Sequence, residues 1–295
     1  MTLDVRDHRL HQLLEKNCQL EQVATGFKFV EGPVWHPGEG FLLFSDILGN
    51  RIYRWRPDQG VEVYREPSHM ANGNTYDRQG NLLTCEHATS RVTRATPNGT
   101  TEVIASHYQG KELNSPNDIV VRSDGLIYFT DPNSGRSEKY GLLRDQELDF
   151  QGVYYLDTNQ ESLTLLVDDF SKPNGLCFSV DENRLFINDS DHDHIRFFDV
   201  QEDGTLTNGR IWTALTADGK GVADGMKIDQ AGNLYCAGPG GVHLFDRHAN
   251  CLGVFSMPEY TTNLAWGDHD LRSLYITAST SIYRLRTRIE GVLVF

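Results

Sequence analysis

Six segments of the 295-residue chain carry a side-chain oxygen at one equivalent position ahead of a turn. The six residues are Glu31, Asn72, Asn117, Asn174, Asp224 and Asn263. Turn chemistry accounts for a single Asn-Gly or Asp-Gly pair, but it gives no reason for an oxygen donor in every repeat. Carboxylate and amide oxygens without Cys or His are the ligands that Ca²⁺ prefers. The pattern therefore predicts a divalent-cation site, with Ca²⁺ favoured and Mg²⁺, Mn²⁺ or Zn²⁺ as alternatives.

The members of this set differ in their expected roles. Glu31 and Asp224 supply two negative charges, which match one Ca²⁺, and Asn117 and Asn174 are the best amide ligands. We expect Asn72 and Asn263 to lie behind the ligands or to face the substrate.

The elements that must position these residues form an internal repeat. Each copy has an apolar strand, a turn rich in Asp, Gly and Asn, a second apolar strand, and a third strand with alternating aromatic residues. The copies begin near Phe41, Asn81, Leu126, Arg184, Asn233 and Ser273. Intervals of roughly 40 to 58 residues suit four-stranded propeller blades. The sequence thus predicts an all-β fold, a six-bladed β-propeller with a central metal site, whose first strands bring the six oxygens to one axis.

We expect residues 21–295 to form this single propeller and residues 1–20 to be an N-terminal extension with a short helix at 10–16. The stretch Glu21–Thr25 is predicted to supply the outer strand of the last blade, which removes a free sheet edge. The insertion Ser134–Gln151 carries several charges and is expected to be a surface loop beside one face.

A second ring of polar residues is expected where the second strands return to the same end of the channel. Its members are Asp46, Glu86, His87, Asp131, Asp189, Ser190, Gly238 and Ser279. His87 is the candidate for proton transfer at physiological pH, and Arg91 is a candidate for orienting a polyhydroxylated ligand. A solvated histidine and a surface salt bridge are the structural alternatives for these two residues.

Composition excludes several classes of partner. The chain has 41 acidic and 27 basic residues and a net charge of −14. We therefore expect no basic face that could bind nucleic acid or an anionic membrane surface. Five widely spaced cysteines without a CxxC pair indicate reduced thiols in a cytoplasmic protein. The sequence contains no GxSxG or Walker motif, which argues against covalent serine catalysis and nucleotide chemistry.

The motifs around the predicted ligands resemble those of the gluconolactonase branch of the senescence-marker-protein/gluconolactonase family. They are FVEGPVW from Phe29, LNSPNDIV from Leu113, FTDP from Phe129, KPNGL from Lys172 and DGM from Asp224. The resemblance implies a six-bladed propeller that hydrolyses sugar lactones with a divalent cation, commonly Ca²⁺. It carries the metal ligands over to Glu31, Asn117, Asn174 and Asp224. One departure is the tripeptide Asn114-Ser115-Pro116, where vertebrate-type members place an arginine that grips the substrate.

The hypothesis is therefore hydrolysis of a lactone such as glucono-1,5-lactone by metal-assisted attack of water. Asp224 and His87 are alternative general bases, and the substrate would be held by Asn72, Asp131, Asn263 and Arg91. Two other functions stay open, a phosphotriesterase or lactonase of another substrate and a non-catalytic Ca²⁺-binding propeller. The expected partner is a small sugar lactone, and the chain is expected to be a monomer or a homodimer.

Overall fold

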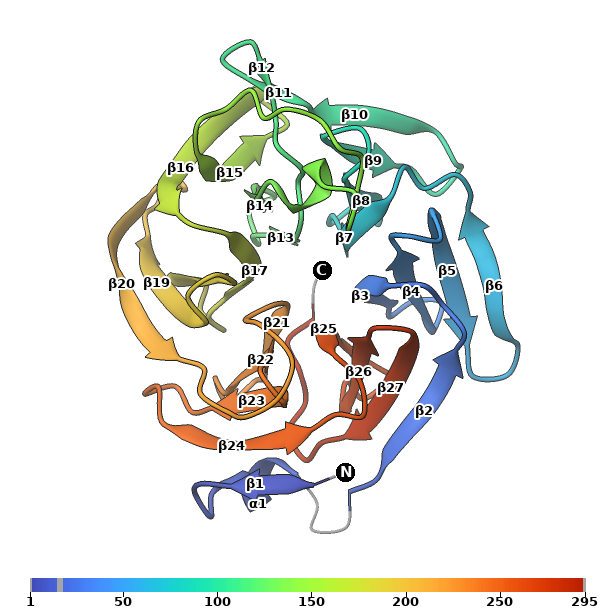
Figure 1. The fold of residues 1–295 in the computed structure, drawn as a ribbon, viewed down its shortest axis with the longest axis vertical. Helices are drawn as coiled ribbons and strands as arrows, with labels where there is room; N and C mark the ends of the chain where they lie inside the picture. The colour runs from blue at the N-terminus through green and yellow to red at the C-terminus, as the bar shows by residue number, and fades with distance from the viewer. Residues whose placement is uncertain (1, 15–17, 294–295) are drawn as a thin grey trace.

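The chain forms six antiparallel sheets around one axis in the computed structural model, which describes residues 2–14 and 18–293 (Figure 1). This confirms the predicted all-β six-bladed propeller. The innermost strand comes first in each blade, and these strands surround the centre of the ring in Figure 1. No helix in the described ranges has the length and apolar character needed to cross a membrane.

From the inner to the outer strand, the first blade consists of β3 (Val30–His36), β4 (Phe41–Asp46), β5 (Arg51–Arg56) and β6 (Gly60–Arg65). The second blade consists of β7 (Ala71–Tyr76), β8 (Leu82–Glu86), β9 (Arg91–Ala95) and β10 (Thr101–Ala105). The third blade consists of β13 (Ile119–Val121), β14 (Ile127–Asp131), β15 (Gln151–Asp157) and β16 (Ser162–Phe170). The fourth blade consists of β17 (Pro173–Phe178), β18 (Arg184–Asp189), β19 (His194–Val200) and β20 (Leu206–Ala214). The fifth blade consists of β21 (Met226–Ile228), β22 (Leu234–Gly238), β23 (Gly241–Phe245) and β24 (Cys251–Ser256). The sixth blade consists of β25 (Thr261–Gly267), β26 (Ser273–Ala278), β27 (Ser281–Arg286) and β2 (Leu20–Thr25).

Burial follows the distance of a strand from the axis. Strands such as β4, with the sequence FLLFSD, are buried throughout because neighbouring blades cover both faces of the sheet. The outer strand β6 is exposed along most of its length. The core lies between blades, where Trp35 of the first blade stacks on Tyr275 of the last with ring centroids 5.4 Å apart.

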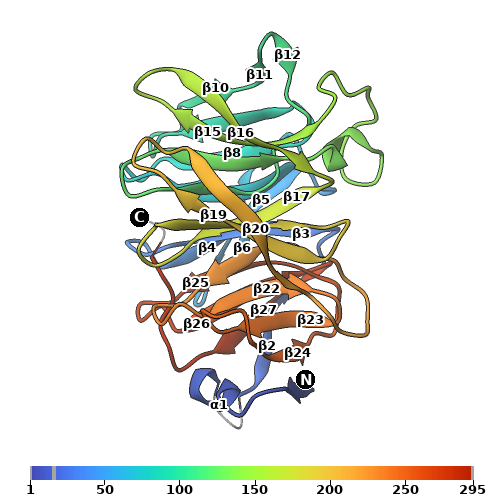
Figure 2. The same ribbon diagram turned by 90° about the vertical axis from the view of Figure 1, so that its left-hand side faces the viewer.

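The N-terminal segment closes the ring. Strand β2 pairs with β27, which confirms the predicted outer strand of the last blade. A further strand, β1 (Leu3–Val5), pairs with β24 and was not predicted; the N-terminal segment lies at the edge of the molecule beside β24 (Figure 2). Helix α1 spans Leu10–Leu13 and buries both of these leucines; Glu15 and Lys16, the end of the predicted helix, lie outside the described residues.

Two elements interrupt the third blade region. A two-stranded hairpin is formed by β11 (His107–Tyr108) and β12 (Lys111–Glu112). The insertion Ser134–Gln151 contains the 3₁₀ helix η1 (Ser134–Arg136), whose Arg136 is buried. The insertion is therefore more than the expected surface loop, because part of it packs into the protein at one end of the channel.

The acidic residues at the ends of the second strands fix the segments that lead to the axis. The Asp46 carboxylate accepts hydrogen bonds from the backbone N–H groups of Lys28, Phe29 and Gly49, at 3.0–3.1 Å. Asp131 binds the two backbone N–H groups of the tripeptide before Asn117 in the same way, and Asp189 binds those of Ser171 and Lys172. These carboxylates were expected near the metal, but they bind backbone because the loop amides of their own blade are the nearest donors.

We expect Asp46→Ala to lower the free energy of unfolding by about 3 kcal/mol, since it leaves partly buried amides without an acceptor. Asp58→Ala, in the exposed turn between β5 and β6, is the matched control and should change stability little. Urea unfolding of both variants measures the difference. Equal stability of the two variants would show that Asp46 does not anchor this segment.

Candidate active site

Five of the six aligned oxygen residues meet in one cavity at the end of the channel where the innermost strands begin. The cavity has a volume of about 240 Å³. It is lined by Glu31, Asn72, Asn117, Asn174 and Asp224, each from a different blade. The sixth residue, Asn263, is buried behind Glu31 and donates a 3.0 Å hydrogen bond to its Oε2 atom. The convergence at the axis agrees with the sequence alignment of the repeats.

Three of the converging side chains carry an oxygen with no hydrogen-bond partner. These buried atoms are Asn72 Oδ1, Asn174 Oδ1 and Asp224 Oδ1. Buried polar oxygens are rarely left unpaired in folded proteins, because removing them from water costs free energy that no protein hydrogen bond then compensates. No group of three or more His, Cys, Asp or Glu side chains that could hold a metal occurs among the described residues. A cation site here therefore needs amide oxygens, and the unpaired oxygens fit a hard divalent cation.

The amide nitrogens are bound in ways that turn the oxygens toward the cavity. Asn174 Nδ2 donates to Ser190 Oγ at 2.9 Å, and Ser190 in turn donates to the carbonyl of Ala223 at 2.6 Å. Asn72 Nδ2 lies 3.1 Å from His87 Nε2. Because each nitrogen has a fixed partner, each Oδ1 atom is left to face a ligand.

Burial strongly affects the two carboxylates of the ring. Desolvation raises the pKa of Glu31 to about 7, although the Gly32 N–H donates to its Oε2 atom at 2.7 Å. Desolvation, followed by the charges of Glu31 and Asp118, raises the pKa of Asp224 well above its usual value. Two ionised carboxylates in this cavity repel each other, and a bound cation would reverse that cost.

A set of hydrogen bonds between blades holds the backbone of the ring residues. Ser45 Oγ donates to the Asn72 carbonyl and Thr130 Oγ1 donates to the Asn174 carbonyl, both at 2.8 Å. Asn188 Nδ2 donates to the Asp224 carbonyl. These donors stand near the ends of second strands and were missed in the sequence, although a small polar residue recurs there and could have revealed them.

His87 is buried at the cavity and both of its ring nitrogens are engaged. Nδ1 lies 2.9 Å from the backbone carbonyl of Tyr140, which can only accept, so Nδ1 carries the proton. Nε2 then accepts the hydrogen bond of Asn72 Nδ2. Burial, assisted by the positive charge of Arg144, lowers the pKa of His87 to about 4. The geometry thus holds a neutral imidazole that orients Asn72.

The insertion reaches the cavity through Tyr140 and is held by two arginines. Arg136 donates to the carbonyls of Leu113 at 2.7 Å and Asn114 at 2.9 Å. Arg144 donates to the His87 carbonyl at 2.8 Å. These bonds fix the insertion over the mouth of the channel, so that it forms one wall of the cavity.

Of the four predicted substrate-binding residues, only Asn72 lines the cavity; besides Asn263, which lies behind Glu31, Asp131 and Arg91 are also absent from its lining. Asp131 is fully buried and uses both carboxylate oxygens on the backbone N–H groups of Asn114 and Ser115. Arg91 forms a 2.6 Å ion pair with the buried Glu86. The structure places both residues in contacts that stabilise the second and third blades.

Several cavity residues were not predicted from the sequence. They are Phe29, Ile47, Ser134, Lys139, Tyr140, Lys172, Asp191, Val222 and Tyr260. Phe29 contacts Tyr140 and Tyr260, with ring centroids 5.1 and 6.3 Å away. Lys172 pairs with Asp191 at 2.6 Å, and Lys139 lies 4.6 Å from the Tyr140 ring centre. The cavity mouth therefore combines aromatic faces with two cations, while no arginine occupies the tripeptide before Asn117.

Comparison with known proteins now identifies the family. The chain matches the SMP-30/gluconolactonase/LRE-like region over residues 29–280 and belongs to that family. A gluconolactonase from Zymomonas mobilis is 30% identical, over 96% of this chain and 85% of the relative. A pentonolactonase from Haloferax volcanii is 27% identical over 87% of this chain and 84% of the relative. The solved gluconolactonase of Xanthomonas campestris superposes with a TM-score of 0.91 and 31% identity, covering 97% of this chain and 95% of that one.

We expect Gly32→Ala to distort the ring of aligned oxygen residues, in addition to the strain of placing an alanine at a positive φ. Gly32 has φ +51°, and an added Cβ would lie 1.9 Å from the Asn72 carbonyl oxygen. Gly80 also has a positive φ, +77°, but an added Cβ has open space. Gly80→Ala should cost about 1–2 kcal/mol, whereas Gly32→Ala should cost more and should weaken Ca²⁺ binding at least about tenfold. Thermal unfolding and titration calorimetry with CaCl₂ measure both, and equal effects of the two variants would contradict this.

The lowered pKa of His87 predicts a specific pH dependence of stability. An unfolded histidine has a pKa of about 6.5, so the unfolded state binds a proton between pH 6.5 and 4 while the folded state does not. The stabilisation from neutral His87 is complete above pH 6.5 and declines as the pH falls toward 4. The wild type should lose about 2 kcal/mol more than His87→Gln between pH 7.5 and 5. Urea unfolding at the two pH values measures it, and parallel losses would show that His87 is protonated in the folded state.

Proposed function

We propose that this protein opens a sugar lactone, such as glucono-1,5-lactone, to the aldonic acid in the 240 Å³ cavity. One divalent cation, with Ca²⁺ favoured, would be held by Glu31, Asn117, Asn174 and Asp224. The observation that carries this proposal is the set of buried, unpaired oxygens of Asn72, Asn174 and Asp224, three residues that line this one cavity. The chain is a lactone hydrolase by family membership and by its gluconolactonase and pentonolactonase relatives.

When bound, the cation would supply Lewis-acid polarisation of the lactone carbonyl and stabilisation of the developing negative charge on its oxygen. The side chains would supply proton transfer and orientation. Asp224 Oδ1, which has no hydrogen-bond partner, would accept a proton from water as the water oxygen attacks the carbonyl carbon. The same proton would then go to the ring oxygen as the carbon–oxygen bond breaks, which yields the hydroxy acid.

In this proposal His87 positions Asn72 and is not the general base. A base needs a free lone pair near the attacking water, and the lone pair of His87 Nε2 already accepts from Asn72. Asn72 Oδ1 would accept a hydrogen bond from a substrate hydroxyl. His87 would thereby act on the reaction through the orientation of this amide.

The mouth of the cavity suits a polyol better than an apolar ester. Lys139 and Lys172 can donate hydrogen bonds to hydroxyl oxygens, while Tyr140, Tyr260 and Phe29 present flat apolar faces to the carbon face of a sugar ring. An apolar phosphotriester would leave the buried amide oxygen of Asn72 without a partner. The lining thus supports a sugar lactone over the phosphotriester alternative.

Removal of the metal should abolish catalysis. We expect protein treated with EDTA to release acid from glucono-1,5-lactone at the uncatalysed rate, and added CaCl₂ to restore activity. A pH-indicator assay, corrected for spontaneous opening of the lactone, measures both states. Full activity after verified removal of all divalent metal would refute metal assistance.

Replacing Glu31 or Asp224 by the corresponding neutral amide should have different effects on calcium binding and catalysis. Glu31→Gln should weaken calcium binding, whereas Asp224→Asn should also lower kcat by roughly 10²–10³-fold at saturating calcium, because it removes the proton acceptor. Glu102→Gln, on the exposed outer strand β10, is the control and should keep full activity. Retention of wild-type kcat by Asp224→Asn with bound calcium would remove Asp224 from the proposed mechanism.

A further inference from the structure

A second cavity occupies the opposite end of the same channel and shares no lining residue with the first. Its volume is about 340 Å³. The innermost strands, together with the residues just before them, line both cavities in turn; for example, Asn72 lines the first and Thr75 the second, and Asp224 lines the first and Lys227 the second. The second cavity is therefore a separate pocket at the far mouth of the channel.

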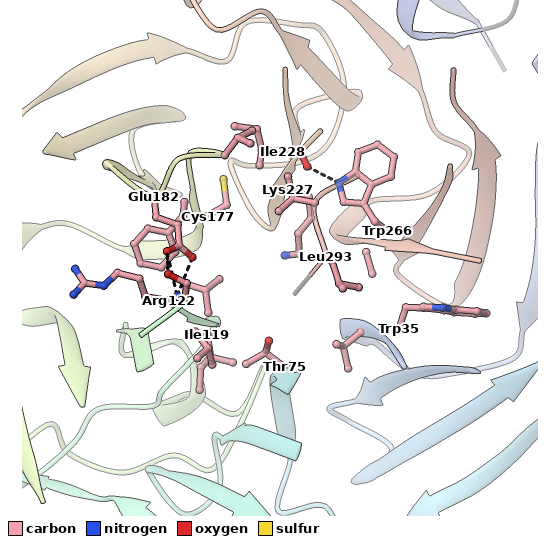
Figure 3. A pocket seen from close by; sticks show the side chains of 18 of the residues that line it. Trp35, Thr75, Ile119, Arg122, Cys177, Glu182, Lys227, Ile228, Trp266 and Leu293 are labelled. Carbon is pink, nitrogen blue, oxygen red and sulfur yellow. Dashed lines mark hydrogen bonds between the residues drawn. The ribbon is translucent and has the colours of Figure 1, made fainter. Parts of the chain in front are cut away.

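The wall of this pocket is largely apolar and well fixed. It includes Val34, Ile119, Phe178, Trp35 and Trp266. Trp35 is held by stacking on Tyr275, and Trp266 Nε1 donates to the Ile228 carbonyl at 2.7 Å. Figure 3 shows Ile119, Lys227 and Leu293 around the centre of the pocket, with the ring of Trp35 directed outward from it. A preformed, largely apolar pocket is typical of a small-molecule site.

The lining also contains polar and charged residues, of which Thr75 and Lys227 carry the argument; the others are Asn74, Arg78, Arg122, Ser123, Ser179 and Glu182. Thr75 is 1% exposed and its Oγ1 atom has no hydrogen-bond partner. The Lys227 side chain extends toward the middle of the pocket in Figure 3, and its Nζ atom donates to the Met226 carbonyl at 3.1 Å. Among the residues that the structure describes, Lys227 forms no ion pair with a carboxylate.

Glu182, the acidic residue that lines the pocket, already has hydrogen-bond partners. The Glu182 carboxylate accepts from the Ser123 backbone N–H at 2.9 Å and from the Ser123 hydroxyl. The positive charge of Lys227 opposes the burial that raises the pKa values of Glu31 and Asp118, but Lys227 forms no ion pair with either carboxylate. An anionic ligand could therefore pair with Lys227, while its apolar body would cover the apolar wall.

We propose that this pocket binds a small monocarboxylic acid with a flat apolar body. The carboxylate would meet Lys227 and a second acceptor atom would take the Thr75 hydroxyl proton. A sugar acid fits this pocket less well, because most of its hydroxyls would be buried against an apolar wall without partners. The site is thus distinct in chemistry from the lactone cavity and does not depend on the proposed hydrolysis.

The probe that tests this is 2-naphthoate, followed by quenching of tryptophan fluorescence in the full chain. We expect saturable binding below about 1 mM, and at least tenfold weaker binding of the uncharged 2-naphthamide. Lys227→Met should weaken naphthoate binding at least tenfold, and Thr75→Val should weaken it less. Lys111→Met, in the hairpin of β11 and β12, is the matched control and should bind as the wild type does.

A steric variant keeps the test decisive if Lys227→Met misfolds. Val180 lines the pocket and is 42% exposed, so Val180→Trp should fold and should block the probe. Gluconate with CaCl₂ should not displace naphthoate. The proposal is overturned if naphthoate does not saturate, if Lys227→Met and Val180→Trp both bind it normally, or if gluconate competes. It is also overturned if naphthoate binds only to a chain that lacks residues 294–295.

Discussion

The site depends on one constraint, which is that two carboxylates and several amide oxygens are buried together at the axis of the propeller. Burial raises the pKa of Glu31 to about 7 and that of Asp224 well above its usual value. Hydrogen bonds from Gly32 and Asn263 satisfy only one oxygen of Glu31. An arrangement of this kind costs free energy unless a cation compensates it, so binding of the proposed cation would stabilise the inner ring.

The remaining structure keeps these oxygens at fixed positions. Asp46, Asp131 and Asp189 bind the backbone that leads into three innermost strands. Hydrogen bonds from Ser45 and Thr130 then link the ring residues to the adjacent blade. The ring closes only because β2 pairs with β27. Each ligand position therefore depends on its neighbouring blade, and preorganisation of this kind is what electrostatic catalysis requires.

The repeats were enough to predict the propeller and the converging oxygens, because both depend on a period that the sequence displays. The second ring could not be assigned in the same way. A carboxylate at a strand end can face the channel or accept hydrogen bonds from loop amides. Asp131 does the second, because the backbone N–H groups of its own blade are the nearest donors. The wall formed by Tyr140 lies in an insertion without a counterpart in other blades, so no periodicity could place it. Likewise, only the neighbours His87 and Glu31 distinguish the unpaired oxygen of Asn72 at the cavity from the hydrogen-bonded amide of Asn263 behind it.

Anomalous scattering from crystals grown with CaCl₂ and soaked with the sugar-acid product tests the central claim most directly. We predict one strong peak on the propeller axis, about 2.3–2.6 Å from oxygens of Glu31, Asn117, Asn174 and Asp224, with the product carboxylate beside it. A peak outside the channel, or an axis without a peak at saturating calcium, would contradict the claim that these buried oxygens form a cation site.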